Sequence, residues 1–256
     1  MIVLPLNTCF ESGIYDAAGT FASPVFTFLI MQSMKEHLVK IKSLKHITHD
    51  VLQVVTTKPH RYNFLPGQAT DISINMEGWE DLLRPFTFTS LPGDEYLEFV
   101  IKTYVERSSV TGKILTLKKG DELLLHEVFG AIEYKGQGVF IAGGAGITPF
   151  ISIIRFLQTR NDLSGNKLIF ANKTRSDIIL QNEFERLLGS NFINILSREK
   201  VDGYAHGYIN AEFLHAHLDS SYKYVYLCGP PPMMDALEIH LSIWGFDRNS
   251  IIQEEI

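Results

Sequence analysis

The stretch Ala142-Gly143-Gly144-Ala145-Gly146-Ile147-Thr148-Pro149 decides the fold class of the second half of this 256-residue chain. It directly follows an apolar run and opens a helical pattern over residues 150–159. Glycines here let the backbone approach a ligand closely, and the free amides of a helix start favour an anion. Thr148 fits an N-cap, with Pro149 at the first helical position. The context predicts a nucleotide-binding loop, with a plain tight turn as the alternative.

The chain around this loop alternates between short apolar runs and helical patterns. Strands are expected over residues 139–142, 167–171, 192–196 and 224–227, and helices over residues 177–188 and 232–244. Such alternation implies a parallel sheet with right-handed crossovers. A second loop, Cys228-Gly229-Pro230, also lies between a strand and a helix. Both loops should therefore lie at the carboxyl ends of their strands, on the rim where ligands bind.

The first half of the chain has a different period. Residues 39–42 and 71–75 alternate with period two, and residues 51–57 and 95–104 are rich in β-branched and aromatic side chains. Turn residues separate these runs, which predicts a closed antiparallel β-barrel. The expected fold is thus two-domain, with an N-terminal antiparallel β-barrel over residues 34–136 and a C-terminal α/β parallel-sheet domain over residues 137–256.

Residues 1–33 differ from the rest of the chain. Their only charged residues are Glu11 and Asp16, and the patterned positions begin after them. We expect this extension to lie outside the working fold, with an added strand or cap as the alternative. Its most apolar run, residues 21–31, is about half the ~20 residues that a transmembrane helix needs. No membrane span is therefore expected. A reducing, cytoplasmic location is expected because the chain has only two cysteines.

Composition excludes several classes of function. The formal net charge is −6, which argues against nucleic-acid binding, because phosphate recognition needs clustered Lys and Arg. The two cysteines, Cys9 and Cys228, cannot build a disulfide framework, a structural zinc site or an iron–sulfur cluster. No metal site is predicted.

A third motif, Arg84-Pro85-Phe86-Thr87, lies in the barrel half. Alone it reads as an ordinary amphipathic edge strand. Together with the two loops, in this order and spacing, it makes residues 38–256 resemble the ferredoxin–NADP+ reductase family of flavoproteins. The resemblance implies a flavin-binding barrel followed by a nicotinamide-nucleotide domain.

The resemblance assigns FAD-binding roles in the barrel. Arg84 would hold the flavin pyrophosphate, because a guanidinium fork suits phosphate oxygens. Phe86 would stack on the isoalloxazine, although Tyr is usual there, and Thr87 would present its hydroxyl near flavin N5. The remaining contacts with the ribityl and phosphate portions would come from Ile101, Lys102, Tyr104 and Thr111. Lys102 is otherwise a solvated strand lysine.

It also assigns a site for NADPH or NADH in the second domain. Gly143, Gly144 and Gly146 would face the pyrophosphate, and Thr148 would lie near the site of hydride transfer. Cys228, Gly229 and Pro230 would approach the nicotinamide. Ser197 and Arg198 are similar to the pair that holds the 2′-phosphate in NADP-preferring members, with Tyr208 on the adenine side. These residues favour NADPH, whereas Asp177 favours NADH.

The C-terminus departs from the family pattern. Glu254 lies two positions from the end, as a functional Glu does in plant-type members, but Ile256 replaces their flavin-stacking Tyr. Thr87, Cys228 and Glu254 are the candidate catalytic residues.

The resemblance implies an FAD-dependent oxidoreductase that passes electrons from NAD(P)H to a separate acceptor. A small flavodoxin or ferredoxin is the first expectation, since no such domain is fused here. One alternative is a reductase for free flavin or ferric chelates, which needs no protein acceptor. A second, of another class, is a non-catalytic nucleotide-sensing module.

Overall fold

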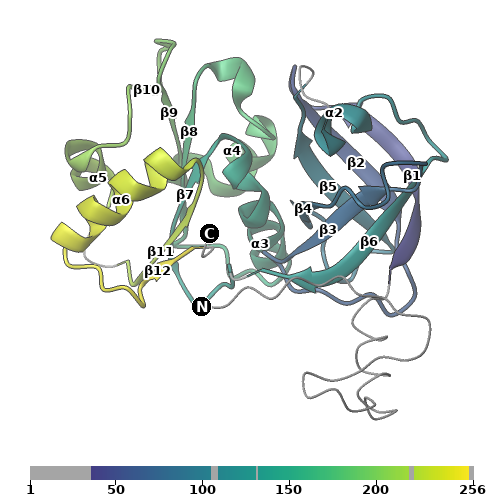
Figure 1. Cartoon of the computed structure of the whole chain (residues 1–256). Helices are drawn as coiled ribbons and strands as arrows, with labels where there is room; N and C mark the ends of the chain where they lie inside the picture. Colours follow the sequence, from purple (N-terminus) through teal and green to yellow (C-terminus); the bar gives the residue numbers. More distant parts are fainter. Residues whose placement is uncertain (1–35, 105–108, 131, 219–221, 254–256) are drawn as a thin grey trace, which may run out of the picture. The chain divides into compact units, whose positions relative to one another are not determined.

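The computed structural model describes residues 36–104, 109–130, 132–218 and 222–253 (Figure 1). The predicted N-terminal extension, residues 1–33, and the candidate catalytic residue Glu254 lie outside these ranges. Residues His37–Ile256 form one compact unit.

The first half forms an antiparallel sheet of six strands in the order β4-β3-β6-β1-β2-β5. Phe88, directly after β4, pairs with Phe99 of β5, so the two edge strands meet and the sheet closes as predicted. Phe88 and Phe99 are fully buried in the barrel core. A short helix, α2, precedes the last strand. The elements are β1 (His37–His46), β2 (Val51–Thr57), β3 (Ala69–Ile74), β4 (Arg84–Thr87), β5 (Tyr96–Lys102), α2 (Val110–Ile114) and β6 (Glu122–Phe129).

The second half forms a parallel sheet of six strands in the order β10-β9-β8-β7-β11-β12, as its alternating pattern predicts. Figure 1 shows α3 and α4 covering one face of this sheet and α5 and α6 the other. The elements are β7 (Gly138–Gly143), η1 (Gly144–Ile147), α3 (Thr148–Thr159), β8 (Lys167–Asn172), η2 (Arg175–Asp177), α4 (Gln181–Leu188), η3 (Gly189–Asn191), β9 (Phe192–Leu196), β10 (Ala205–His206), α5 (Ala211–His217), β11 (Tyr224–Cys228), α6 (Pro231–Ile243) and β12 (Ile251–Ile252).

The strand order places a topological switch point at β7. The chain leaves β7 for β8 on one side, whereas β11 pairs with β7 on the other. Alternate residues of β7 supply the two cores, Phe140 and Ala142 toward α3 and Val139 and Ile141 toward α6. In open α/β sheets, ligands bind at the carboxyl ends of the strands beside such a switch point.

The expected helix over residues 177–188 is shorter in the structure, where α4 begins at Gln181. The Asp177 carboxylate accepts hydrogen bonds from the Thr174 amide and hydroxyl, at 2.8 and 2.7 Å, and so caps the preceding turn, η2. Ile178 is extended and Leu180 is left-handed, with φ of 53°. The capped turn and the two buried isoleucines that follow it delay the start of the helix.

The hydroxyl of Tyr226 in β11 ties the parallel sheet to the segment that leads into it. It accepts hydrogen bonds from the amides of Lys135 and Gly136, at 2.9 and 3.1 Å, and donates to the Gly136 carbonyl at 2.7 Å. Burial raises the pKa of Tyr226 to about 12, although the two amides lower it in part. At neutral pH the hydroxyl is therefore protonated, and it both accepts and donates hydrogen bonds to this segment.

We predict that Tyr226→Phe lowers the free energy of unfolding by about 1–3 kcal/mol, because two part-buried amides lose their acceptor. The neighbouring Tyr224→Phe is the control and should change it by less than about 0.5 kcal/mol. Because the folded pKa is raised, the protonated hydroxyl stabilises the fold below pH ~10 and this contribution is lost between pH ~10 and ~12. Urea unfolding at pH 7 and pH 11 measures both effects. Equal losses for the two variants would contradict the assignment.

Candidate active site

The two predicted loops meet at the carboxyl end of the parallel sheet. Ala142 of β7 is the register partner of Cys228 of β11. A β-carbon added to Gly146 would lie 2.2 Å from the carbonyl oxygen of Cys228, so glycine is required at that point of contact. Gly229 is less constrained, since its β-carbon would lie 2.3 Å from the methyl group at the flexible end of Met233. The structure therefore brings the glycine loop and the Cys228 loop together on one rim.

Gly144 has a different requirement. Its φ is 53°, a left-handed conformation that favours glycine, and an added β-carbon would meet nothing within 4 Å. The backbone of η1 is thus open to a ligand at this residue. Gly143 is closed on one side, because its β-carbon would lie 2.8 Å from both Met233 Sδ and Pro230 Cδ.

Thr148 is not the N-cap that the sequence predicts. Its backbone is already helical, with φ −57° and ψ −44°, because η1 runs directly into α3. Ile147 occupies the N-cap position instead. The Thr148 hydroxyl donates to the Ala145 carbonyl at 3.1 Å and lies 3.4 Å from the hydroxyl of Thr87.

The Thr87–Thr148 approach joins two of the residues that the sequence singles out. Thr87 ends β4 of the barrel, and Thr148 opens α3 of the α/β half. Both side chains are half-buried. The candidate flavin motif and the candidate nucleotide loop thus meet at one place in the structure.

The rest of the β4 motif has the chemistry that an FAD molecule requires. Arg84 is exposed and donates from Nη1 to the carbonyl of its neighbour Leu83 at 2.7 Å, which leaves its other guanidinium donors available for phosphate. Phe86 is half-buried against the barrel core and keeps part of its ring accessible. A cationic donor, an aromatic ring and a hydroxyl therefore follow one another along β4.

The other barrel residues predicted to contact FAD differ in burial and in their hydrogen-bond partners. Ile101 is buried in the barrel core, so only its backbone is left for a cofactor. Tyr104 is 45% exposed. The Thr111 hydroxyl lies 2.9 Å from that of Ser109, which caps α2.

Lys102 is engaged within the protein. Its Nζ lies 2.7 Å from Asp50 Oδ2, and both side chains are about one-quarter exposed. Burial alone would raise the pKa of Asp50, but the hydrogen bond and charge of Lys102, with smaller contributions from Thr48 and His49, lower it overall. The solvated lysine that the sequence allowed as an alternative is not what the structure shows.

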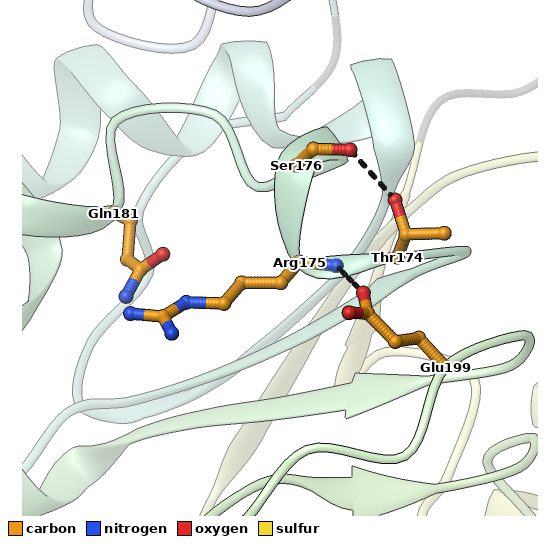
Figure 2. Close-up of a pocket in the computed structure, with 5 residues that line it drawn as sticks. All are labelled: Thr174, Arg175, Ser176, Gln181 and Glu199. Atoms are coloured by element: carbon orange, nitrogen blue, oxygen red, sulfur yellow. Dashed lines mark hydrogen bonds between the residues drawn. The ribbon is translucent and has the colours of Figure 1, made fainter.

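An open pocket of about 590 Å³ lies where β8 and β9 end, lined by Thr174, Arg175, Ser176, Gln181 and Glu199. Figure 2 shows the Arg175 side chain extending toward Gln181, while its backbone amide donates to Glu199 Oε2 at 2.7 Å. The guanidinium also lies 5.8 Å from the centre of the Tyr204 ring. The pocket therefore offers one cation and one carboxylate.

Sequence reasoning found this region only in part. Ser197 and Arg198 follow β9 and are tied through their amides to the carbonyls of Asn172 and Lys173, at 3.0 and 2.9 Å. Arg198 and Tyr208 are exposed, and neither lines the pocket. Gln181 and Glu199 were not among the candidates, although the Thr174-to-Asp177 capping spacing marks a turn there.

Comparison with known proteins agrees with the division of the chain into two different halves. The FAD-binding domain model matches residues 36–128, and the Oxidoreductase NAD-binding domain model matches residues 140–238. The NADH-cytochrome b5 reductase 1 of Aspergillus terreus is 31% identical over 230 residues, covering 81% of this chain and 77% of the relative. A glycine betaine monooxygenase reductase subunit of Pseudomonas aeruginosa is 29% identical over 254 residues, covering 93% of this chain and 68% of the relative.

Solved structures share the fold. A ferredoxin NADP+ reductase from Neisseria gonorrhoeae, with bound FAD and NADP, superposes with a TM-score of 0.76 at 20% identity and covers 86% of this chain and 98% of its own. The cytochrome b5 reductase domain of Ulva prolifera nitrate reductase gives 0.72 at 24% identity, covering 86% and 97%.

The fold and site define a two-domain reductase with a flavin half and a nicotinamide-nucleotide half. The chain belongs to the ferredoxin–NADP+ reductase family of flavoproteins, as its motifs suggested, and is a flavin-dependent NAD(P)H oxidoreductase. In the part of the chain that the structure describes, none of the helices has the length and apolar character needed to span a membrane.

We predict that Gly146→Ala separates the two loops, because its methyl group would collide with the backbone of Cys228. Affinity for NAD(P)H should fall at least about tenfold, equivalent to ~1.4 kcal/mol. The control is Gly245→Ala, after α6, which costs about 1–2 kcal/mol of left-handed backbone strain but has space for the methyl group. Titration with the dinucleotide and thermal unfolding separate binding from stability. Equal loss of affinity in both variants would show that loop packing is not the cause.

Proposed function

We propose that this protein binds FAD against β4 and transfers electrons from NADH, bound at the β7–β11 rim, to a separate one-electron carrier protein. The observation that carries the proposal is the 3.4 Å approach of Thr87 to Thr148. The family resemblance assigns Thr87 to the flavin ring and Thr148 to the site of hydride transfer. Their contact supports ring sites that lie next to each other, as direct transfer between the rings requires.

Flavin supplies the redox chemistry when bound, because it takes two electrons from a nicotinamide and releases them singly. The protein's own residues bind and orient. Arg84 holds the pyrophosphate, Phe86 packs on the ring, and Thr87 donates a hydrogen bond at the reactive edge. Backbone atoms of Ile101, with Lys102, Tyr104 and Thr111, complete the cofactor contacts. Glu254 is the proposed catalytic carboxylate near the C-terminus.

On the nucleotide side, the open backbone at Gly144 and the helix start behind it favour a pyrophosphate. Gly143 and Gly146 keep the loop close to the sheet. Cys228, Gly229 and Pro230 form the wall on which the nicotinamide lies, and Cys228 is half-buried there. Thr148 completes the site from the α3 side.

The dinucleotide is proposed to be NADH rather than the NADPH that Ser197 and Arg198 favoured. Glu199 lines the pocket at the ends of β8 and β9, and only one of its oxygens is occupied by the Arg175 amide. In dinucleotide-binding folds, a carboxylate at this edge accepts a hydrogen bond from the ribose 2′-hydroxyl, whereas an Arg accommodates a 2′-phosphate. The relative from Aspergillus terreus is also named for NADH. Arg175, which lines the same pocket, favours NADPH instead, because an Arg can accommodate a 2′-phosphate.

The acceptor is proposed to be a small one-electron carrier protein. The named relatives serve a cytochrome b5 and a monooxygenase, which supports a haem or oxygenase component before the flavodoxin or ferredoxin first expected. Reduction of purified cytochrome b5, ferredoxin and flavodoxin, at equal concentrations, ranks these acceptors. Reduction of free flavin and ferric chelates faster than all three would favour the alternative without a protein acceptor.

We predict that Arg84→Ala weakens FAD retention about 10- to 150-fold, because one charge-assisted phosphate contact is worth roughly 1.5–3 kcal/mol. Arg160→Ala, which removes an exposed guanidinium from the end of α3, is the matched control and should retain FAD. Fluorescence titration of the apoprotein with FAD gives both dissociation constants. A protein that cannot be reconstituted with flavin at all would overturn the proposed function.

We also predict that Glu199→Gln reduces the NADH-over-NADPH ratio of kcat/KM about tenfold, since it removes a charge that repels the 2′-phosphate. Asp202→Asn, an exposed change in the following loop, should leave the ratio unchanged. Arg198→Ala should affect both dinucleotides alike. Steady-state assays with ferricyanide measure these ratios. A selective loss of NADPH activity in Arg198→Ala, by about 10- to 150-fold, would restore the NADPH assignment.

A further inference from the structure

One face of α3 carries polar side chains that contact the barrel. Thr148, Ser152 and Arg155 lie at intervals of four and three residues, which places them on the same side of a helix. Thr148 lies against Thr87, and Ser152 Oγ accepts a hydrogen bond from the Gly67 amide at 3.0 Å. Arg155 makes the third contact. Polar interactions inside a buried interface fix a position more narrowly than apolar packing, because they require specific partners.

Arg155 uses its whole guanidinium fork. Nη1 donates to Glu98 Oε1 at 2.6 Å and to the Thr89 carbonyl at 2.8 Å. Nε and Nη2 donate to the two carboxylate oxygens of Glu183, at 2.6 and 2.9 Å. The side chains of Arg155, Glu98 and Glu183 are only 20%, 7% and 21% exposed. One side chain therefore binds the barrel with one arm and α4 with the other.

Glu98 is itself held in place by the barrel. Its carboxylate accepts from the Thr89 hydroxyl at 2.9 Å and from Gln53 Nε2 at 2.7 Å. Burial opposes the charge of Arg155, but the hydrogen bonds and charges of Glu183 and Glu98 outweigh it and raise the pKa of the guanidinium. The ion pair thus has one partner in each half of the protein.

Two contacts join α3 to the chain segment 87–89 of the barrel, next to the proposed ring sites. Thr89, whose carbonyl Arg155 binds, lies two residues after Thr87 on the same chain segment. Arg155 lies seven residues after Thr148, or about 10 Å along α3. The Thr87–Thr148 contact is the second tie between the same two segments. Movement of α3 against the barrel would break the hydrogen bonds of Arg155 to Glu98 and Thr89.

We propose that Arg155, through its ion pair with Glu98, is a positioning residue for flavin reduction, which sets the distance between the two ring sites by fixing α3 on the barrel. The inference rests on the proposed function. Arg155 acts through Thr87 and Thr148 and touches neither ring. A displacement of about 1 Å between reacting groups costs up to roughly 100-fold in rate, so a tie of this kind has a large kinetic effect.

The two arms of the fork provide a matched pair of variants. Glu98→Gln weakens the arm that reaches the barrel, and Glu183→Gln weakens the arm that stays within the α/β half. Gln53→Ala controls for the barrel's internal support of Glu98. Arg155→Lys keeps the charge but cannot form both arms with the geometry of a guanidinium.

The holoproteins are compared by stopped-flow flavin reduction at saturating NADH, with unlabelled and 4-deuterated cofactor. Glu98→Gln and Arg155→Lys should reduce the rate about 10- to 100-fold with little change in NADH affinity. They should also increase the deuterium isotope effect on the rate of flavin reduction. Glu183→Gln and Gln53→Ala should stay within about twofold of the original protein, even where they lower the melting temperature.

Hydrogen exchange supplies a readout that needs no turnover. The Gly67 amide is protected by Ser152 of α3, so its exchange should accelerate in Glu98→Gln and not in Glu183→Gln. Equal effects of the two Gln variants on rate and exchange, or no effect, would overturn the proposal. If NADH fails to reduce the unaltered flavoprotein, the proposed function falls and the catalytic role of Arg155 falls with it. The exchange of Gly67 then still decides whether Arg155 holds α3 on the barrel.

Discussion

The contact on which the site depends is the approach of two backbones at the carboxyl end of the parallel sheet. The Gly146 α-carbon lies so close to the Cys228 carbonyl that no side chain fits between them. This contact fixes where α3 begins, because η1 and α3 follow the glycine loop without a break. The position of α3 in turn determines which residues reach the barrel. Loop packing, helix placement and the meeting of the two halves are therefore successive consequences of one close contact.

Much of the fold follows from the sequence because its two halves have different hydrophobic periods. The alternating strands of the barrel and the short buried strands of the parallel sheet were recognisable, and β9 has the predicted limits. The start of α4 was wrong, since the apolar pattern from Ile178 onward resembles a helix although Asp177 caps a separate turn. The helix α5 was not predicted, yet Asn210 caps it through the Phe213 amide at 2.8 Å. Local hydrogen bonds of this kind decide boundaries that periodicity does not.

The site was predictable where function requires unusual residues and less so where it depends on geometry. The glycines of the loop and the Arg84–Thr87 run stand out in the sequence, and the structure brings Thr87 to Thr148. Lys102 looked like a free cation, but Asp50 is 52 positions away in the chain and its ion pair could not be read from local spacing. Glu199 lies 24 positions after Arg175 in the chain, yet both residues line one pocket together with Gln181. Local spacing in the sequence does not show this.

The shared use of α3 has a consequence for how this architecture tolerates recombination. Its first residue contacts Thr87 of the barrel, and its middle carries a guanidinium that pairs with Glu98 of β5. A barrel taken from a relative would therefore bring its own residue at the Glu98 position beneath this Arg155. Where that residue is not acidic, the exchange would leave a part-buried cation paired with Glu183 alone and would remove its ionic tie to the barrel. The two halves are thus units of fold, but inheritance and engineering must treat Glu98, Arg155 and Glu183 as one unit.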